Sequence, residues 1–152
     1  RRVFKIVTIV VEELAVRLLK EKKLKITPKR ILVLNALLKN TSKAYSFSEL
    51  LNHLTGKMNR STIYRSLDTL LENDLITKMI DTNGDIIYTL NFEEKCEHKL
   101  HPHLKCDQCG VLECLPAFPQ SYANILQQLG VDKLNILLGG ICFNCLEKNE
   151  ND

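Results

Sequence analysis

The sequence has no long apolar run, which argues against a chain that spans a membrane. Its longest strongly apolar stretch, residues 6–11, is followed at once by Glu12 and Glu13 and lacks the small-residue cleavage site of a signal peptide. With 152 residues, 45% hydrophobic and 26% charged, the composition is that of one globular domain or two small ones. We expect a cytoplasmic protein without a membrane partner, truncated at its start because the first residue is Arg1 rather than Met.

The sequence also lacks the patterns that carry catalysis. It has no nucleophile placed with a base and an orienting group, no glycine-rich phosphate loop, and no pair of carboxylates spaced for acid–base chemistry. His53 stands alone on a predicted helix and is expected to be a surface or half-buried side chain. The sequence therefore predicts neither an enzyme nor a small organic substrate.

Cysteine is absent from the first ninety residues, and all six cysteines and three of the four histidines lie between Cys96 and Cys145. Six cysteines could form three disulfides in a small secreted domain, but the cysteine-free part looks able to form its own helical core. Residues 1–90 hold sixteen Lys or Arg and nine Asp or Glu, a net charge of +7, and the remainder carries −4. We therefore expect metal binding in a reducing compartment, and a polyanion is a candidate partner for the basic part.

Helical periodicity dominates the first seventy residues. It predicts helices over 12–23, 27–40, 46–54 and 59–73, and Thr27 followed by Pro28 is typical of a helix start. The runs 75–80 and 86–90 are rich in β-forming residues and are separated by a turn containing Asn83-Gly84, a strong hairpin signal. Helices followed by a hairpin indicate a winged helix-turn-helix domain over residues 1–92.

The chain changes character after the hairpin. A polar segment, about residues 91–99, is expected to be a hinge. Residues 103–115 predict two short strands around a Cys-x-x-Cys turn, 119–129 a helix, and 134–138 a strand before a second Cys-x-x-Cys. We therefore expect the α+β class, with a small α/β domain over residues 100–152 behind the winged helix.

The two Cys-x-x-Cys turns are the strongest chemical signal. Two residues between cysteines let both thiolates of a tight turn reach one metal ion, and two such turns complete a tetrahedral set. Disulfides, a redox motif or plain buried thiols are the alternatives, and the paired spacing favours zinc. The predicted structural zinc ligands are Cys106, Cys109, Cys142 and Cys145.

Five further candidate ligands crowd into nineteen residues beside these turns: Cys96, His98, His101, His103 and Cys114. Side chains alternate along a strand, so the two histidines of a His-x-His strand share a face. A set of imidazoles and thiolates suits Zn²⁺ better than Fe²⁺, which would attract more carboxylate. We therefore predict a second, regulatory divalent metal. The alternative is that some of the five candidate ligands are solvated polar residues or packing thiols.

The exposed edge of the fourth predicted helix could read DNA. Hydroxyls and guanidinium groups there can bond to phosphates and base edges, and apolar atoms can touch a thymine methyl. Basic residues at the start of the second helix, and Lys78 on the hairpin, could hold the flanking backbone. A solvated charged face is the alternative. The predicted DNA-binding residues are Lys25, Lys29, Arg30, Arg60, Ser61, Thr62, Tyr64 and Arg65.

Four segments together resemble the ferric uptake regulator (Fur) superfamily, in that family's order. They are residues 25–30 (KITPKR), 61–67 (STIYRSL), 101–110 (HPHLKCDQCG) and 140–145 (GICFNC), within a resemblance that covers about 22–146. The resemblance implies a metal-sensing regulator, in most members a repressor, that binds an AT-rich inverted-repeat operator in double-stranded DNA as a homodimer. It implies that Tyr64 and Arg65 lie on the major-groove helix, that Lys25 enters the minor groove, and that the paired cysteines hold the structural zinc.

The sensing site departs from the iron-sensing pattern of this superfamily. Ala44 and Thr89 stand where iron-sensing members have a His and a Glu, whereas His101 and His103 are kept. The zinc-uptake (Zur) branch uses a Cys after the wing, for which Cys96 is the candidate, and an acid after Cys109, where Cys114 stands instead. Because sulfur in place of oxygen ligands favours zinc over iron, we expect a zinc-responsive regulator closer to the Zur branch. An iron-responsive regulator, a thiol-redox or peroxide-responsive regulator, and a winged helix that binds a protein instead of DNA remain the alternatives.

Overall fold

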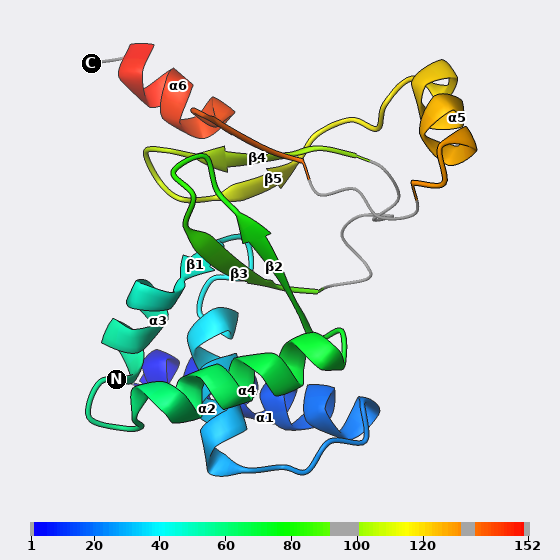
Figure 1. The fold of residues 1–152 in the computed structure, drawn as a ribbon. Coiled ribbons are helices and arrows are strands. Elements are labelled where there is room, and N and C mark those ends of the chain that lie inside the picture. The colour runs from blue at the N-terminus through cyan, green and yellow to red at the C-terminus, as the bar shows by residue number, and fades with distance from the viewer. Residues whose placement is uncertain (1, 92–100, 132–135, 151–152) are drawn as a thin grey trace. The chain divides into compact units, whose positions relative to one another are not determined.

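The computed structural model describes residues 2–91, 101–131 and 136–150 (Figure 1). The chain forms two compact units, the first made of residues 1–41, 45–78 and 87–91 and the second of residues 42–44, 79–86 and 92–152. The predicted hinge at 91–99 lies outside the described residues except for Asn91. Within the described part of the chain, no helix is long and apolar enough to cross a membrane.

Four helices build most of the first unit: α1 (Arg2–Glu21), α2 (Pro28–Leu38), α3 (Phe47–Leu54) and α4 (Arg60–Glu72). The last three agree with the helices that the sequence predicts. Helix α1 begins ten residues earlier than its predicted start. The sequence does not predict this first half as helix, because it is rich in Val and Ile, which have weak helix propensity, and has no capping signal.

Side chains cap three of these helices. Thr27 Oγ1 accepts from Arg30 N at 3.3 Å at the start of α2, and Asn59 Oδ1 accepts from Thr62 N at 2.9 Å at the start of α4. Ser46 and Glu49 form a reciprocal capping box at α3. These caps fix where each helix begins.

A leucine-rich core holds the helices together. Its members come from all four helices and from the sheet behind them, and α2 packs against α1, α3 and α4. The fully buried large side chains include Leu19, Leu34, Leu37, Leu50, Leu54, Ile63, Leu67, Leu70, Ile76 and Ile87. Burial of this many apolar groups stabilises the unit without any crosslink.

The wing is a hairpin of β2 (Ile76–Ile80) and β3 (Ile86–Leu90), and a short strand β1 (Tyr45–Ser46), not predicted, pairs with β3 to give the order β1-β3-β2. Figure 1 shows that the chain passes from α4 directly into β2. Between these elements Asp74 has φ 55°. The turn over residues 81–85, called the wing turn below, has Gly84 at φ 85° and a bond from Asp81 N to Asp85 O at 2.9 Å, as the Asn-Gly signal predicts.

The second unit contains β4 (His103–Cys106), β5 (Leu112–Cys114), α5 (Gln120–Gln128), β6 (Leu137–Gly140) and α6 (Phe143–Glu150). β4 is central, antiparallel to β5 and parallel to β6. The strand predicted over 134–138 is observed over Leu137–Gly140, so it runs two residues past its predicted end. Ile136 precedes the strand, and residues 134 and 135 lie outside the described residues. The sequence does not predict α6, because this helix is short, polar and begins inside the second Cys-x-x-Cys motif.

The wing turn, itself part of the second unit, contacts the sheet of that unit. Asp81 accepts from Lys105 Nζ at 2.8 Å, and its Oδ1 accepts from the backbone N–H groups of Asn83 and Asp85 at 2.9 and 3.0 Å. A Cβ added to Gly139 would lie 3.1 Å from Thr82 Oγ1 and 3.2 Å from Thr82 Cγ2. The turn therefore sits directly against the backbone of β6.

Candidate metal sites and nucleic-acid interface

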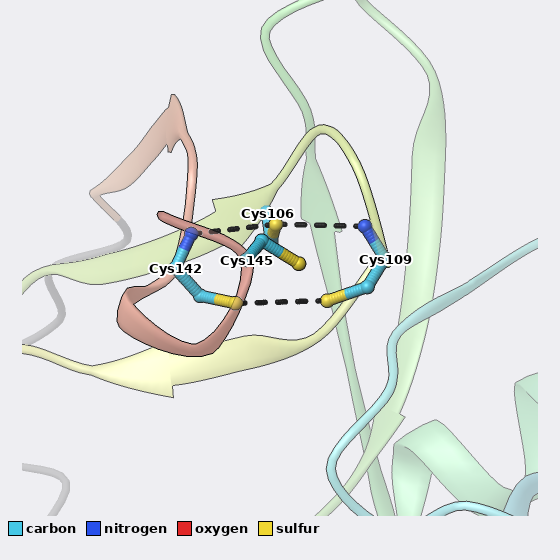
Figure 2. A group of neighbouring side chains, drawn as sticks. All are labelled: Cys106, Cys109, Cys142 and Cys145. Carbon is cyan, nitrogen blue, oxygen red and sulfur yellow. Dashed lines mark hydrogen bonds between the residues drawn. The ribbon is translucent and has the colours of Figure 1, made fainter. Parts of the chain in front are cut away.

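The paired Cys-x-x-Cys motifs form one cluster, called the cysteine tetrad below. Figure 2 shows the four sulfur atoms turned toward a common centre, two from the turn between β4 and β5 and two from the turn that starts α6. All four sulfurs lie within 4.8 Å of one another. Cys109 is exposed and Cys106, Cys142 and Cys145 are buried, so the centre is closed on most sides.

The tetrad has the dimensions of a tetrahedral zinc site. Four Zn–S bonds of about 2.3 Å at tetrahedral angles place neighbouring sulfurs about 3.8 Å apart. The sulfurs of Cys109 and Cys142 are 3.7 Å apart. Because four free thiols supply a complete tetrahedral set and three of them are buried, a metal here would be enclosed and structural rather than catalytic.

Electrostatics favour a cation at the tetrad. The backbone N–H groups of Cys142 and Cys109 donate to Cys106 Sγ at 3.4 and 3.5 Å and lower the pKa of that thiol to about 6. Burial, with the neighbouring cysteines, raises the pKa of Cys145 to about 12. Without a cation the cluster cannot hold four negative sulfurs, whereas Zn²⁺ bound there would stabilise all of them as thiolates.

A second cluster lies on the same ribbon and is called the His–Cys cluster below. One ligand atom each from His101, His103 and Cys114 lies within 4.8 Å of the others. His103 and Cys114 are directly opposed in the β4–β5 pair, and the two imidazole centroids are 4.6 Å apart. Three soft or borderline donors around one point suit a divalent metal that leaves further positions open.

Two predicted members of this second site, Cys96 and His98, lie outside the described residues. Cys114 differs from the tetrad in being disulfide-bonded, while the four tetrad thiols are free. It therefore needs reduction before its sulfur can bind a metal. His101 is buried, His103 half-buried and Cys114 exposed, so the cluster is more open than the tetrad.

The predicted DNA-reading residues lie on the first two turns of α4. Arg60, Ser61, Tyr64 and Arg65 are exposed and Thr62 is half-buried, while Ile63, Leu67 and Leu70 of the same helix are buried. The hydroxyl of Ser61 already donates to Asn59 Oδ1 at 3.0 Å, so it helps to hold the cap of α4.

The basic residues near α2 have different surroundings. Lys25 and Lys29 are exposed, and Lys78 is exposed on β2. Arg30 donates from Nη1 to the Lys25 carbonyl at 2.7 Å. Part of the Arg30 guanidinium is therefore used to fix the loop that precedes α2.

Phe47 contacts the exposed edge of α4 and is not among the residues that the sequence predicts for DNA binding. Its ring stacks on that of Tyr64 with centroids 3.9 Å apart and an interplanar angle of 8°. The Arg60 guanidinium lies 5.2 Å from the Phe47 centroid and 5.8 Å from the Tyr64 centroid. Nothing in the local pattern links α3 to α4 across this distance in sequence, so only the tertiary fold reveals the contact.

The model of the ferric uptake regulator family matches residues 21–118. The zinc uptake regulation protein of Escherichia coli (strain K12) is 26% identical over 133 residues, which cover 84% of this chain and 76% of that protein. The protein of the same name from Shigella flexneri matches equally.

Solved structures have the same fold. The structure of a zinc uptake regulator complexed with zinc and DNA matches with a TM-score of 0.68 and 24% identity, covering 94% of this chain and 97% of that chain. The ferric uptake regulator of Vibrio cholerae matches with a TM-score of 0.61 and 24% identity, over 83% and 98% of the two chains. The chain therefore belongs to the ferric uptake regulator family, whose members are transcription regulators and not enzymes.

Proposed function

We propose that the protein is a zinc-responsive transcription repressor, which binds an AT-rich inverted-repeat operator as a homodimer when a regulatory metal is bound. The observation that carries this proposal is the His–Cys cluster, which stands apart from the tetrad and offers two imidazoles and one sulfur. That donor set is softer than the oxygen-rich sets that bind iron, so it favours Zn²⁺. The zinc uptake regulator of Escherichia coli, a relative, supports the same metal.

The tetrad would hold a structural zinc, and the second site would hold the sensed metal. Cys96 and His98 are proposed as further members of the second site. Metal at the His–Cys cluster would fix the hinge and hold two recognition helices at the spacing of two successive major grooves. DNA would then bind the metal-loaded state better, and by thermodynamic reciprocity DNA would tighten metal binding.

The DNA-binding surface is proposed to be the exposed edge of α4, with Tyr64 and Arg65 in the major groove and Lys25 in the minor groove. Its support is the exposure of these side chains on a helix whose other face is buried. Phosphate contacts would come from Lys29, Arg30, Arg60, Ser61 and Thr62, with Lys78 on the wing.

A homodimer is supported by apolar side chains in the second unit. Tyr122 and Ile125 on α5 are 47% and 51% exposed, and Leu129, the C-cap residue of α5, is 74% exposed. The three recur at helical spacing. No residue of α5 is buried within the chain. A stripe of this kind needs a covering surface, and a second copy of the chain would supply it.

Metal content of the reduced protein tests the proposal. We expect two zinc ions per chain by elemental analysis, one of them removed by a mild chelator. The labile zinc should be absent from His103→Ala and Cys114→Ser and present in the control His53→Ala. A single, tightly held zinc that neither substitution affects would contradict the zinc-sensor proposal, and iron titrations would then test His101 and His103 as an iron site.

A thiol-redox regulator is the second candidate, because Cys114 is disulfide-bonded. Cys96 is proposed as its partner, because the other four cysteines are free. Two sulfurs that can bond to each other can also reach one metal ion, so oxidation and metal binding would compete for Cys114. DNA binding that is lost on treatment with hydrogen peroxide and restored by dithiothreitol, at constant zinc, would favour this candidate.

A further inference from the structure

The aromatic stack on the first unit is a surface feature rather than part of the core. Tyr64 is 39% exposed and Phe47 is half-buried, while the leucine core lies on the other face of α4. Phe47 is the first residue of α3, and Tyr64 is on the second turn of α4. The stack thus joins the start of one helix to the exposed edge of the next.

Arg60, the third member of the stack, lies where the dipole of its own helix is unfavourable to a cation. Arg60 is the first residue of α4, where the partial positive charge of the helix N-terminus disfavours a cation, and no acidic residue lies in that turn to offset it. Both aromatic rings are within 6 Å of its guanidinium, the range in which an arginine is attracted to a ring face. The rings therefore give this arginine a defined position.

We infer that Phe47 is a positioning residue for DNA recognition: it holds Tyr64 and Arg60 on α4 in one orientation before DNA arrives. This inference depends on the proposed function of α4. An exposed tyrosine or arginine otherwise loses rotamer freedom on binding, and that loss weakens affinity. Phe47 reduces the loss because its ring covers one face of Tyr64 and lies under the Arg60 guanidinium.

The inference is tested with the zinc-loaded full chain and a duplex that this protein selects from a randomised library. We expect Phe47→Leu to weaken binding to that duplex by about two- to tenfold, the worth of one aromatic stack. Binding to a shuffled duplex should weaken less, because only the phosphate contact of Arg60 depends on Phe47, and the slope of affinity against salt should change by at most that one contact. Phe47→Tyr, which keeps a ring, should bind like the wild type.

Two controls separate positioning from general damage. His53→Leu removes a ring from another pair that involves α3, whose centroids with Tyr45 are 5.9 Å apart, and should leave binding unchanged. In a double-mutant cycle, Phe47→Leu and Tyr64→Leu should be less than additive, since each removes the same stack. If the Phe47→Leu variant does not fold, the Phe47→Met variant is used in the same measurements.

The outcomes are distinct. Wild-type affinity in Phe47→Leu, full additivity in the cycle, or equal weakening by leucine and tyrosine would overturn the inference. If the wild-type protein enriches no duplex from the library, the proposed DNA-binding function fails instead.

Discussion

The two units reach stability by different routes. The first buries a leucine-rich core and contains no cysteine. In the second, the buried apolar side chains among the described residues are Ala44, Met79 and three cysteines of the tetrad. A small unit with so little apolar burial needs a crosslink or a metal. The comparison teaches that the buried cysteines of the tetrad stand where the second unit has few other buried apolar side chains, whereas the His–Cys cluster is more open and is the site proposed to respond to metal.

Removing one tetrad ligand is the strongest way to test this contrast. We expect Cys142→Ser to lose the tightly held zinc and to unfold β4, β6 and α6, because structural zinc binding contributes roughly 10–16 kcal/mol of folding free energy in small domains. Zinc analysis and amide exchange should report both losses, with α2 and α4 still protected. Cys114→Ser is the matched control and should keep the tetrad zinc. Retained zinc and protected β4 amides in Cys142→Ser would refute the comparison.

The second cluster should govern response rather than folding. We expect His103→Ala to reduce the zinc stimulation of binding to the selected duplex by about 5- to 150-fold, the usual range of coupling between two sites. Fluorescence anisotropy with and without zinc measures this ratio. Thermal unfolding should change little compared with His53→Ala. An unchanged ratio in His103→Ala would remove this histidine from the sensing site.

The ion pair at the wing turn should matter less than either metal site. Asp81 is buried and accepts three hydrogen bonds, so Asp81→Asn should lower the free energy of unfolding by about 1.5–3 kcal/mol. Asp85→Asn, an exposed carboxylate in the same turn, is the matched control. Urea unfolding of both variants gives the comparison, and equal effects would show that Asp81 has no special role.

The same ion pair has a pH dependence of known sign. The hydrogen bond from Lys105 is the main cause that holds the pKa of Asp81 below its ordinary value of 3.8. Its stabilisation is therefore complete above pH 3.8 and is lost as the pH falls through the lowered pKa. The difference in unfolding free energy between wild type and Asp81→Asn should shrink over that acidic range, and a difference that grows there would contradict this account.

The smallest expected effect lies in the first unit. Ser46→Ala removes one half of the capping box of α3 and should cost about 1 kcal/mol of unfolding free energy. Zinc content should not change, because the two units are stabilised separately. Ser48→Ala, at an exposed position of α3, is the control and should have no measurable effect. Loss of zinc from Ser46→Ala would show that the stability of the second unit depends on the first, contrary to the comparison.

Local signals in the sequence are enough to predict most of the fold. Thr27-Pro28, the leucine spacing of α2 and α4, and Asn83-Gly84 each act within one helix or turn, so they can be read without the tertiary structure. β1 could not be predicted, because a strand of two residues is too short to show an alternating hydrophobic pattern. Its pairing with Tyr88 depends on a contact more than forty residues away in sequence.

The tetrad is predictable because its spacing is local in each half, and the structure confirms that the halves meet. The His–Cys cluster is predictable only in part. The expected His-x-His strand places His101 and His103 on one face, although β4 begins only at His103, and the β4–β5 pairing brings in Cys114. Phe47 and the ion pair of Asp81 could not be predicted, because each joins segments through tertiary contacts that leave no spacing signal.

The close approach at Gly139 sets a limit on how this sequence can vary. A Cβ at position 139 would lie 3.1–3.2 Å from the Thr82 side chain, which would have to move by a few tenths of an ångström. Shortening position 82, as in Thr82→Ala, removes this contact and makes room for an alanine at 139. The two positions are therefore coupled in evolution: the residue at one alters which side chains the other accepts without a shift of the wing turn.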